Sequence, residues 1–259
     1  MTLSFKGIEV FYTRRGKGKT LLLLHGFLEN QHMWNELTPS LSETHTVISI
    51  DLLGHGQTEC YGYIHTMEDM AEFVHAVLEH ENIQEWVAIG HSMGGYVALA
   101  LAEQNPDKTK GIILVNSTAS ADSEERKINR TRAILAVKQN YKNFVGIAIS
   151  NLFRPKNRTI FADKIQEIRA QALQTPLQGI IAALEGMKIR KDRINFLKST
   201  SIPKLYIIGK NDPVIDYEMI KSETSIVKAK KHEFEDGHMS HIENRNELLT
   251  QIVHFIEYI

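Results

Sequence analysis

Five short apolar runs, each ended by glycine or small polar residues, constrain the fold of this 259-residue chain more than any other feature. They are TLLLLHGF, THTVISIDLLGHG, EWVAIGHSMGG, KGIILVNST and PKLYIIGKND. Such runs have no polar face, so we expect strands that are buried on both sides, as in a parallel sheet. Residues 3–12 alternate between apolar and polar side chains and predict two further strands around a turn at Gly7. The stretch around His232 predicts an eighth strand.

Helical patterns separate these strands. The segments TMEDMAEFVHAVLEHE and NELLTQIVHFIEYI each gather apolar residues on one face. Strands that alternate with amphipathic helices indicate an α/β fold with a mostly parallel sheet flanked by helices. Residues 118–199 break the alternation, because they carry helical patterns and no convincing strand. We therefore expect a core formed by residues 1–117 and 200–259, with an all-helical insertion between them.

Charge and cysteine content exclude several classes of protein. Lysine plus arginine is 30 and aspartate plus glutamate is 31. The chain thus lacks the excess of basic residues that would indicate nucleic acid or an anionic membrane as a partner. Cys60 is the single cysteine, which excludes an intramolecular disulfide. The apolar runs are too short to cross a bilayer, and the first residues lack the pattern of a signal peptide. A cytoplasmic location is the expectation.

The stretch Gly90-His91-Ser92-Met93-Gly94 is the strongest candidate for chemistry. It matches Gly-x-Ser-x-Gly, and it stands between a predicted strand and a helix predicted from Tyr96 to Gln104. This context predicts a sharp, strained turn that exposes the serine hydroxyl above the sheet. Ser92 is therefore the expected nucleophile.

A serine near neutral pH needs a base, and the base needs an orienting carboxylate. Four of the twelve histidines follow the last predicted parallel strands, namely His232, His238, His241 and His254. We favour His238, on a loop after Gly237, and keep His241 as its rival. For the acid we favour Asp212, in the turn after the strand LYIIG, and keep Asp216 as its rival.

The oxyanion that forms during acyl transfer needs two backbone N–H donors. We expect one from Met93, which follows the serine, and one from Phe27 in the loop HGFLEN. No cofactor is implied, and no metal-binding spacing such as His-Glu-x-x-His is present.

These residues resemble the α/β-hydrolase superfamily. The resemblance rests on HGF at 25–27, DLLGHGQT at 51–58, GHSMGG at 90–95, GKNDPV at 209–214 and GHMSHIE at 237–243. It implies the α/β-hydrolase fold, with the insertion as a cap over the active site, and it implies Ser92, Asp212 and His238 as nucleophile, acid and base. It also implies that the Asp51 loop is structural. Relatives that open epoxides or displace halide use an aspartate nucleophile, and Ser92 at that position argues against both activities.

Within the superfamily the chain is most similar to small bacterial carboxylesterases and, more distantly, to the menaquinone-pathway lyases called SHCHC synthases. Those lyases tend to carry an arginine shortly after the nucleophile, where this chain has Tyr96. Four cap arginines are candidates to replace it, although exposure on the surface is the expectation for them: Arg126, Arg130, Arg132 and Arg154. We expect most of six apolar cap residues to pack inside the cap and some to line a pocket: Phe144, Ile147, Leu152, Phe153, Ile180 and Leu184.

The expected function is hydrolysis of a small-molecule carboxylic ester through an acyl-enzyme intermediate. Cleavage of a C–C bond, or lyase chemistry like that of SHCHC synthase, would use the same three residues. A different class is a ligand-binding protein with slow turnover, as in some hormone receptors of this superfamily. The substrate-binding residues, the natural substrate and the oligomeric state are not predicted.

Overall fold

The computed structural model describes residues 1–259 and is built on one eight-stranded sheet. Its strands are β1 (Thr2–Phe5), β2 (Ile8–Arg15), β3 (Thr20–Leu24), β4 (Thr46–Ile50), β5 (Trp86–His91), β6 (Thr109–Val115), β7 (Lys204–Gly209) and β8 (Lys230–Phe234). They lie in the order β1-β2-β4-β3-β5-β6-β7-β8. The first two strands are antiparallel to their neighbours, and β3 to β8 are parallel. The predicted fold class is therefore confirmed.

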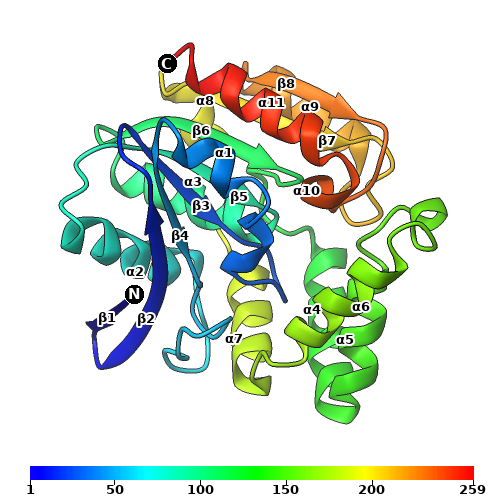
Figure 1. Cartoon of the computed structure of the whole chain (residues 1–259). Helices are drawn as coiled ribbons and strands as arrows, with labels where there is room; N and C mark the ends of the chain where they lie inside the picture. The colour runs from blue at the N-terminus through cyan, green and yellow to red at the C-terminus, as the bar shows by residue number, and fades with distance from the viewer.

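Helices cover both faces of the sheet (Figure 1). They are η1 (Gln31–Trp34), α1 (Thr38–Ser42), α2 (Met67–His80), α3 (Met93–Gln104), α4 (Glu124–Gln139), α5 (Tyr141–Ser150), η2 (Pro155–Asn157), α6 (Ala162–Ala172), α7 (Leu177–Lys188), α8 (Ile194–Ser199), α9 (Tyr217–Ile226), α10 (Ser240–Glu243) and α11 (Arg245–Ile256). None of them combines the length and the apolar composition that crossing a membrane would require.

Strand β3 explains why its sequence has no polar face. Leu22 and Leu24 pack in one cluster with α2 and α3, whereas Leu21 and Leu23 pack in another with α1 and α11. Successive side chains of a strand point to opposite faces, so both faces of β3 are buried under helices. Each leucine so buried contributes about 2 kcal/mol of hydrophobic free energy.

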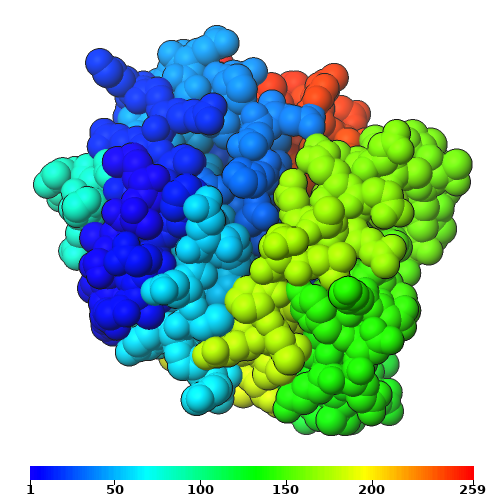
Figure 2. Space-filling model, turned by 60° about the horizontal axis from the view of Figure 1, so that its bottom comes forward, coloured from blue at the N-terminus to red at the C-terminus, as the bar shows by residue number.

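The segment between β6 and β7 contains helices and no strand. Figure 1 shows α4, α5, α6 and α7 gathered on one side of the sheet, and Figure 2 shows this segment, green to yellow-green, as a lobe against the cyan loop before α2. The contact is made through backbone, because a Cβ at Gly179 would collide with the carbonyl oxygen of Gly54. A Cβ at Gly186 would likewise collide with the carbonyl oxygen of His65. Helix α7 is thus held directly against the sheet-bearing part of the chain.

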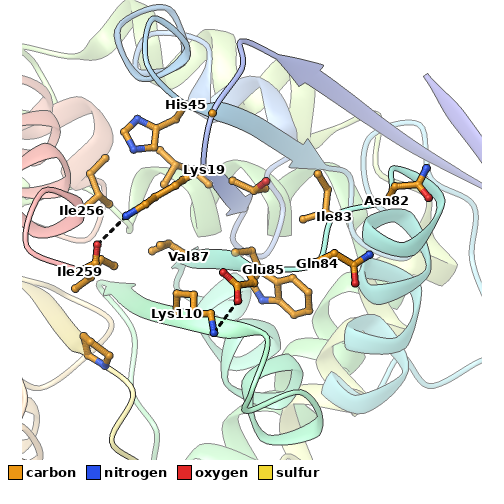
Figure 3. Close-up of a pocket in the computed structure, with 15 residues that line it drawn as sticks. Lys19, His45, Asn82, Ile83, Gln84, Glu85, Val87, Lys110, Ile256 and Ile259 are labelled. Atoms are coloured by element: carbon orange, nitrogen blue, oxygen red, sulfur yellow. Dashed lines mark hydrogen bonds and ion pairs between the residues drawn. The ribbon is translucent and has the colours of Figure 1, made fainter.

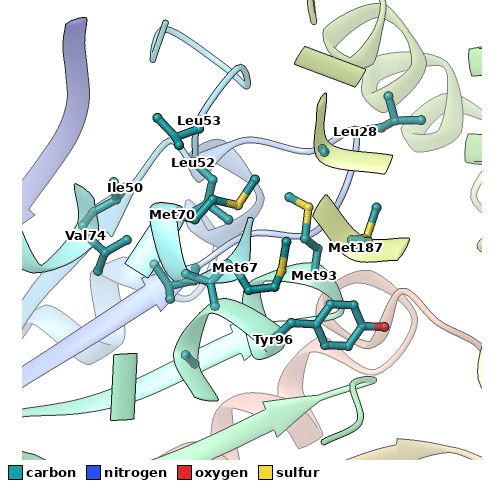
Figure 4. Packing of buried hydrophobic residues seen from close by; sticks show 14 of the residues in the cluster. Leu28, Ile50, Leu52, Leu53, Met67, Met70, Val74, Met93, Tyr96 and Met187 are labelled. Carbon is teal, nitrogen blue, oxygen red and sulfur yellow. The ribbon is translucent and has the colours of Figure 1, made fainter. Parts of the chain in front are cut away.

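The apolar interior runs without a break from the sheet into residues 118–199, which are the predicted cap and are called the cap below. Met70 of α2, Met93 of α3 and Met187 of α7 belong to one buried cluster, which Figure 4 shows from close by. At the far end of the cap, Leu197 of α8 packs in a different cluster with Tyr206 of β7. The division of the chain at residues 117/118 and 199/200 stays a prediction.

Candidate active site

The turn between β5 and α3 holds Ser92 in a strained conformation, with φ of 48° and ψ of −114°. A non-glycine residue rarely adopts a positive φ, and it does so where tertiary packing enforces it. A Cβ at Gly94 would collide with the carbonyl oxygen of Leu24, so only glycine fits beside the neighbouring strand. Helix α3 begins at Met93, three residues before the predicted start. The reason is that Gly94 and Gly95 disfavour a helix intrinsically but are required here for close approach.

Asp212 and His238 form a buried pair at the carboxyl ends of β7 and β8. His238 Nδ1 lies 2.7 Å from Asp212 Oδ2, and both side chains are at most 3% exposed. The other oxygen, Asp212 Oδ1, accepts the backbone N–H groups of Val214 and Ile215 at 2.7 and 3.0 Å. Burial alone raises the pKa of Asp212, but His238 and the two N–H donors outweigh it and leave the pKa below its usual value. The carboxylate is ionised and fixed in orientation.

The second nitrogen of His238, Nε2, makes no hydrogen bond within the protein, and neither does Ser92 Oγ. Both residues line one cavity of about 90 Å³, whose wall also contains Phe27, Tyr96 and Leu152. The sequence-predicted nucleophile and base are therefore brought to one cavity. Hydrogen bonds between such groups are often long before a substrate binds.

Each rival has another partner. Asp216 is the N-cap of α9, where its side chain accepts the backbone N–H of Met219 at 2.7 Å. His241 is buried with its Nε2 3.6 Å from a carboxylate oxygen of Glu29. His232 lies in β8 and His254 on the exposed side of α11. None of these four lines the cavity that contains Ser92.

The backbone N–H groups of Phe27 and Met93, the two predicted oxyanion donors, make no hydrogen bond within the protein. Met93 is the first residue of α3, where N–H groups have no partner inside the helix. Phe27 lies in a turn closed by a bond from the N–H of Glu29 to the carbonyl of Gly26 at 3.2 Å. Both donors thus remain free to bind an oxyanion.

Sequence reasoning missed a second carboxylate–histidine pair in the wall of the cavity. Glu29 Oε2 lies 2.7 Å from His91 Nδ1 and accepts the N–H of Gly26 at 2.9 Å. On its other side, His91 Nε2 donates to the backbone carbonyl of His238 at 2.9 Å. Both ring nitrogens of His91 face acceptors, so the imidazole carries two protons. His91 occupies the first x of the Gly-x-Ser-x-Gly motif, where any residue is allowed, and nothing in the sequence marked Glu29 as its partner.

The electrostatics of this second pair agree with an ion pair. Burial lowers the pKa of His91, but the adjacent carboxylate and the His238 carbonyl raise it above its usual value overall. Burial raises the pKa of Glu29, but His91, His241 and His25 lower it, to about 2. The pair thus places one positive and one negative charge directly below the loop of His238.

Asn116 is a further residue that the sequence did not indicate. It follows β6 with a positive φ of 46°. Its side-chain amide donates to Asp212 Oδ2 and to the carbonyl of Gly237, both at 3.1 Å, and its oxygen accepts the hydroxyl of Ser240 at 2.6 Å. It joins the loops after β6, β7 and β8. The one signal for this role is that asparagine adopts a left-handed backbone conformation more readily than most residues. The sequence does not reveal that Asn116 has that conformation.

Surface exposure was the expectation for four cap arginines, and it was right for Arg132 alone. Arg126 and Arg130 line the cavity with Ser92, because the first turns of α4 lie above the carboxyl edge of the sheet. Arg132 is exposed, as expected, and Arg154 pairs with Asp236 at 3.1 Å. Among the six apolar cap candidates, Leu152 lines the cavity, whereas Ile147 is exposed and the other four are buried or partly buried in the cluster that joins cap and sheet.

The Asp51 loop has the structural role that the resemblance implied. Asp51 accepts the backbone N–H groups of Gln31 and Gln57 at 2.8 and 2.9 Å, one on each carboxylate oxygen. Two loops are thereby tied together, and Asp51 does not line the cavity with Ser92.

A larger pocket of about 450 Å³ lies at the opposite edge of the sheet, around the amino ends of β3 and β5 (Figure 3). Its two lysines are already bonded: Lys19 donates to the carbonyl of Ile259 at 3.1 Å, and Lys110 pairs with Glu85 at 2.9 Å. It contains no nucleophile beside a histidine–carboxylate pair. The cavity at Ser92 is the candidate active site.

Comparison with known proteins agrees with this geometry. Residues 19–169 match the family model described as alpha/beta hydrolase fold. The chain is 33% identical over 115 residues, 43% of its length, to an uncharacterized hydrolase, YugF, of Bacillus subtilis, and the match covers 42% of that protein. It is 26% identical to the pimeloyl-[acyl-carrier protein] methyl ester esterase of Aeromonas hydrophila, over 96% of this chain and 100% of the relative.

Solved structures are similar over the whole chain. A malate-bound thermophilic esterase from Thermogutta terrifontis superposes with a TM-score of 0.92 at 29% identity, covering 99% of this chain and 96% of the esterase. An enol-lactonase from Burkholderia xenovorans gives 0.91 at 21% identity, covering 99% and 100%, which supports the fold alone. The family match spans more than half of the sequence and agrees with the sheet order described above. The chain belongs to the α/β-hydrolase family, with esterases among its relatives.

Proposed function

We propose that this hydrolase cleaves a small-molecule carboxylic ester through an acyl-enzyme intermediate on Ser92. The observation that carries the proposal is the 2.7 Å pair of His238 Nδ1 and Asp212 Oδ2, whose histidine faces the same cavity as Ser92. A fixed carboxylate orients the imidazole so that Nε2 can take a proton from the hydroxyl. The esterases among the similar proteins support the same reaction class.

In the first step Ser92 Oγ attacks the ester carbonyl carbon while its proton passes to His238 Nε2. The carbonyl oxygen becomes an oxyanion, which the free N–H groups of Phe27 and Met93 stabilise, each by about 3 kcal/mol. The C–O bond to the alcohol then breaks, and His238 returns the proton to the leaving oxygen. Asp212 stays ionised throughout and stabilises the imidazolium.

In the second step a water molecule gives its proton to His238 Nε2 and attacks the acyl carbon. Collapse of this second oxyanion breaks the bond to Ser92, which regains the proton from His238. The overall reaction consumes the ester and one water molecule and yields a carboxylic acid and an alcohol.

The cavity of about 90 Å³ favours short esters. The cytoplasm is the proposed location, and the unpaired Cys60 agrees with it.

The test is hydrolysis of p-nitrophenyl esters of increasing acyl length by the wild type, Ser92→Ala and the exposed-site control Ser199→Ala. We expect kcat to fall roughly a millionfold in Ser92→Ala and to be unchanged in the control. A fluorophosphonate probe, read by mass spectrometry, should label Ser92 of the wild type. Wild-type activity in Ser92→Ala would overturn the proposal. A labelled Ser92 without hydrolysis of any ester would overturn the ester substrate but keep the nucleophile.

A further inference from the structure

Three arginines of the cap surround one buried carboxylate beside the active-site cavity. Asp122, whose side chain is fully buried, contacts Arg130 and Arg190 by ion pairs, and its Oδ1 lies 3.3 Å from Arg126 Nε. Burial raises the pKa of Asp122, but Arg130 and Arg190 lower it below its usual value, so the carboxylate is charged. Three guanidinium groups against one carboxylate leave two positive charges in excess.

The two members that line the cavity have N–H groups to spare. Arg190 does not line the cavity, and it uses four of its five N–H groups on Asp122 and on the carbonyls of Ser120 and Met187. Its guanidinium also stacks on the ring of Tyr96 at 4.1 Å. Arg126 donates one N–H group to the carbonyl of Val214 at 3.1 Å, and its Nη2 has no acceptor in the protein. Arg130 binds Asp122 through Nε and Nη2 and leaves Nη1 without an acceptor.

No other carboxylate neutralises this excess at the cavity wall. The acidic residue that lines the cavity is Glu29, which is already paired with His91. Asp212 is paired with His238 behind the wall. The arginine side chains are 31% and 14% exposed at positions 126 and 130, so they are partly shielded from water, which strengthens their attraction for an anion. Asp122 and Val214 also fix the guanidinium planes before a ligand arrives.

We infer that Arg126 and Arg130 form an anion subsite, and that the preferred substrates are short esters with a free carboxylate on either side of the ester bond. This inference rests on the proposed function of Ser92. A guanidinium group matches the two oxygens of a carboxylate with parallel N–H donors. The small cavity requires that carboxylate to lie only a few bonds from the ester carbonyl.

The experiment compares charged and neutral esters of equal shape, with hydrolysis followed by acid release in a pH-stat. Monoethyl succinate is paired with ethyl levulinate, and carboxymethyl butyrate with acetonyl butyrate. In at least one pair we expect the wild type to prefer the anion by roughly tenfold to a hundredfold in kcat/KM. Arg130→Met should abolish most of this ratio, Arg130→Lys should retain part of it, and Arg132→Met on the exposed side of α4 should leave it unchanged.

A second measurement does not depend on the folding of any variant. Free succinate should inhibit wild-type hydrolysis of ethyl levulinate competitively, and the inhibition should weaken as salt concentration rises. Neutral esters that are hydrolysed as well as their charged partners, without inhibition by succinate, would overturn the subsite and leave the esterase proposal standing. A preference that survives Arg130→Met and Arg126→Met would also overturn it. If no ester is hydrolysed and the probe does not label Ser92, the proposed function itself fails.

Discussion

Two buried carboxylate–histidine pairs are joined by a hydrogen bond between His91 and the backbone of His238, and they differ in a single respect. In the pair Asp212–His238 the imidazole keeps one nitrogen without a protein partner, at the wall of the cavity. In the pair Glu29–His91 that nitrogen donates to the backbone carbonyl of His238. Both distances are 2.7 Å, so geometry within the pair does not distinguish them. The difference lies in the second imidazole nitrogen, Nε2. It has no protein partner in the proposed base, His238, and it is hydrogen-bonded in the structural histidine, His91.

The largest effect that separates the two pairs is expected from His238→Gln. Glutamine keeps a polar side chain but cannot take the proton of Ser92, so kcat should fall roughly a millionfold. His241→Gln, three residues further along the chain in α10, is the matched control and should lower kcat less than tenfold. Steady-state kinetics with circular dichroism of both variants test this. An equal loss in His241→Gln would reverse the assignment of the base.

The second pair should respond mainly in stability. Glu29→Gln removes the charge that pairs with His91 and leaves a buried imidazolium uncompensated, at a cost of about 3 kcal/mol in the free energy of unfolding. Because His91 also holds the carbonyl of His238, kcat should fall by roughly tenfold. Glu36→Gln, an exposed carboxylate bound to Arg245, should cost less than about 1 kcal/mol. Urea denaturation measures both variants, and equal stability of the two would contradict a structural role for the pair.

Buried histidines outside the two pairs should make the fold sensitive to acid. Burial lowers the pKa of His55 to about 3 and those of His65 and His241 to about 4. The unfolded chain takes up protons near pH 6.5, before the native state does, so stability falls as pH decreases from 6.5 towards 4. Each such histidine contributes a slope of at most about 1.4 kcal/mol per pH unit.

His91 should behave in the opposite way, because its pKa is raised in the folded state. Its contribution is complete below pH 6.5 and is lost as pH rises through the folded-state pKa. Unfolding free energies measured from pH 5 to pH 9 should thus decline on both sides. In His91→Gln the alkaline decline should become shallower while the acid decline persists. If the unfolding free energy of His91→Gln declined as steeply at alkaline pH as that of the wild type, His91 would not be protonated in the native state.

The smallest effect concerns the rival acid. Asp216→Ala removes the N-cap of α9 and should cost about 1 kcal/mol of stability without a change in kcat. Asp212→Asn, by contrast, should lower kcat by roughly ten-thousand-fold, since the imidazole loses its orienting charge. Kinetics and thermal unfolding of the two variants give the comparison. A collapse of kcat in Asp216→Ala would make that residue the acid.

The sequence by itself determined the sheet and the order of the chemical groups along it. Apolar runs without a polar face specify doubly buried strands, and parallel strands bring their carboxyl ends to one edge, so Ser92, Asp212 and His238 could be placed near one another from their positions after strands. The glycines around Ser92 signalled the sharp turn, because few other residues allow so close an approach of backbones.

Only the tertiary structure decided what packs against those groups. Glu29 and His91 are 62 residues apart in the chain, and Asn116 and Asp212 are 96 apart. Arg126 and Arg130 have the sequence pattern of an exposed helix face, and they line a cavity because the cap positions α4 above the sheet edge. Local sequence encodes the periodicity and turns of each element. It does not encode which polar side chains from distant elements meet when the elements are packed together, because that depends on contacts made by the whole chain.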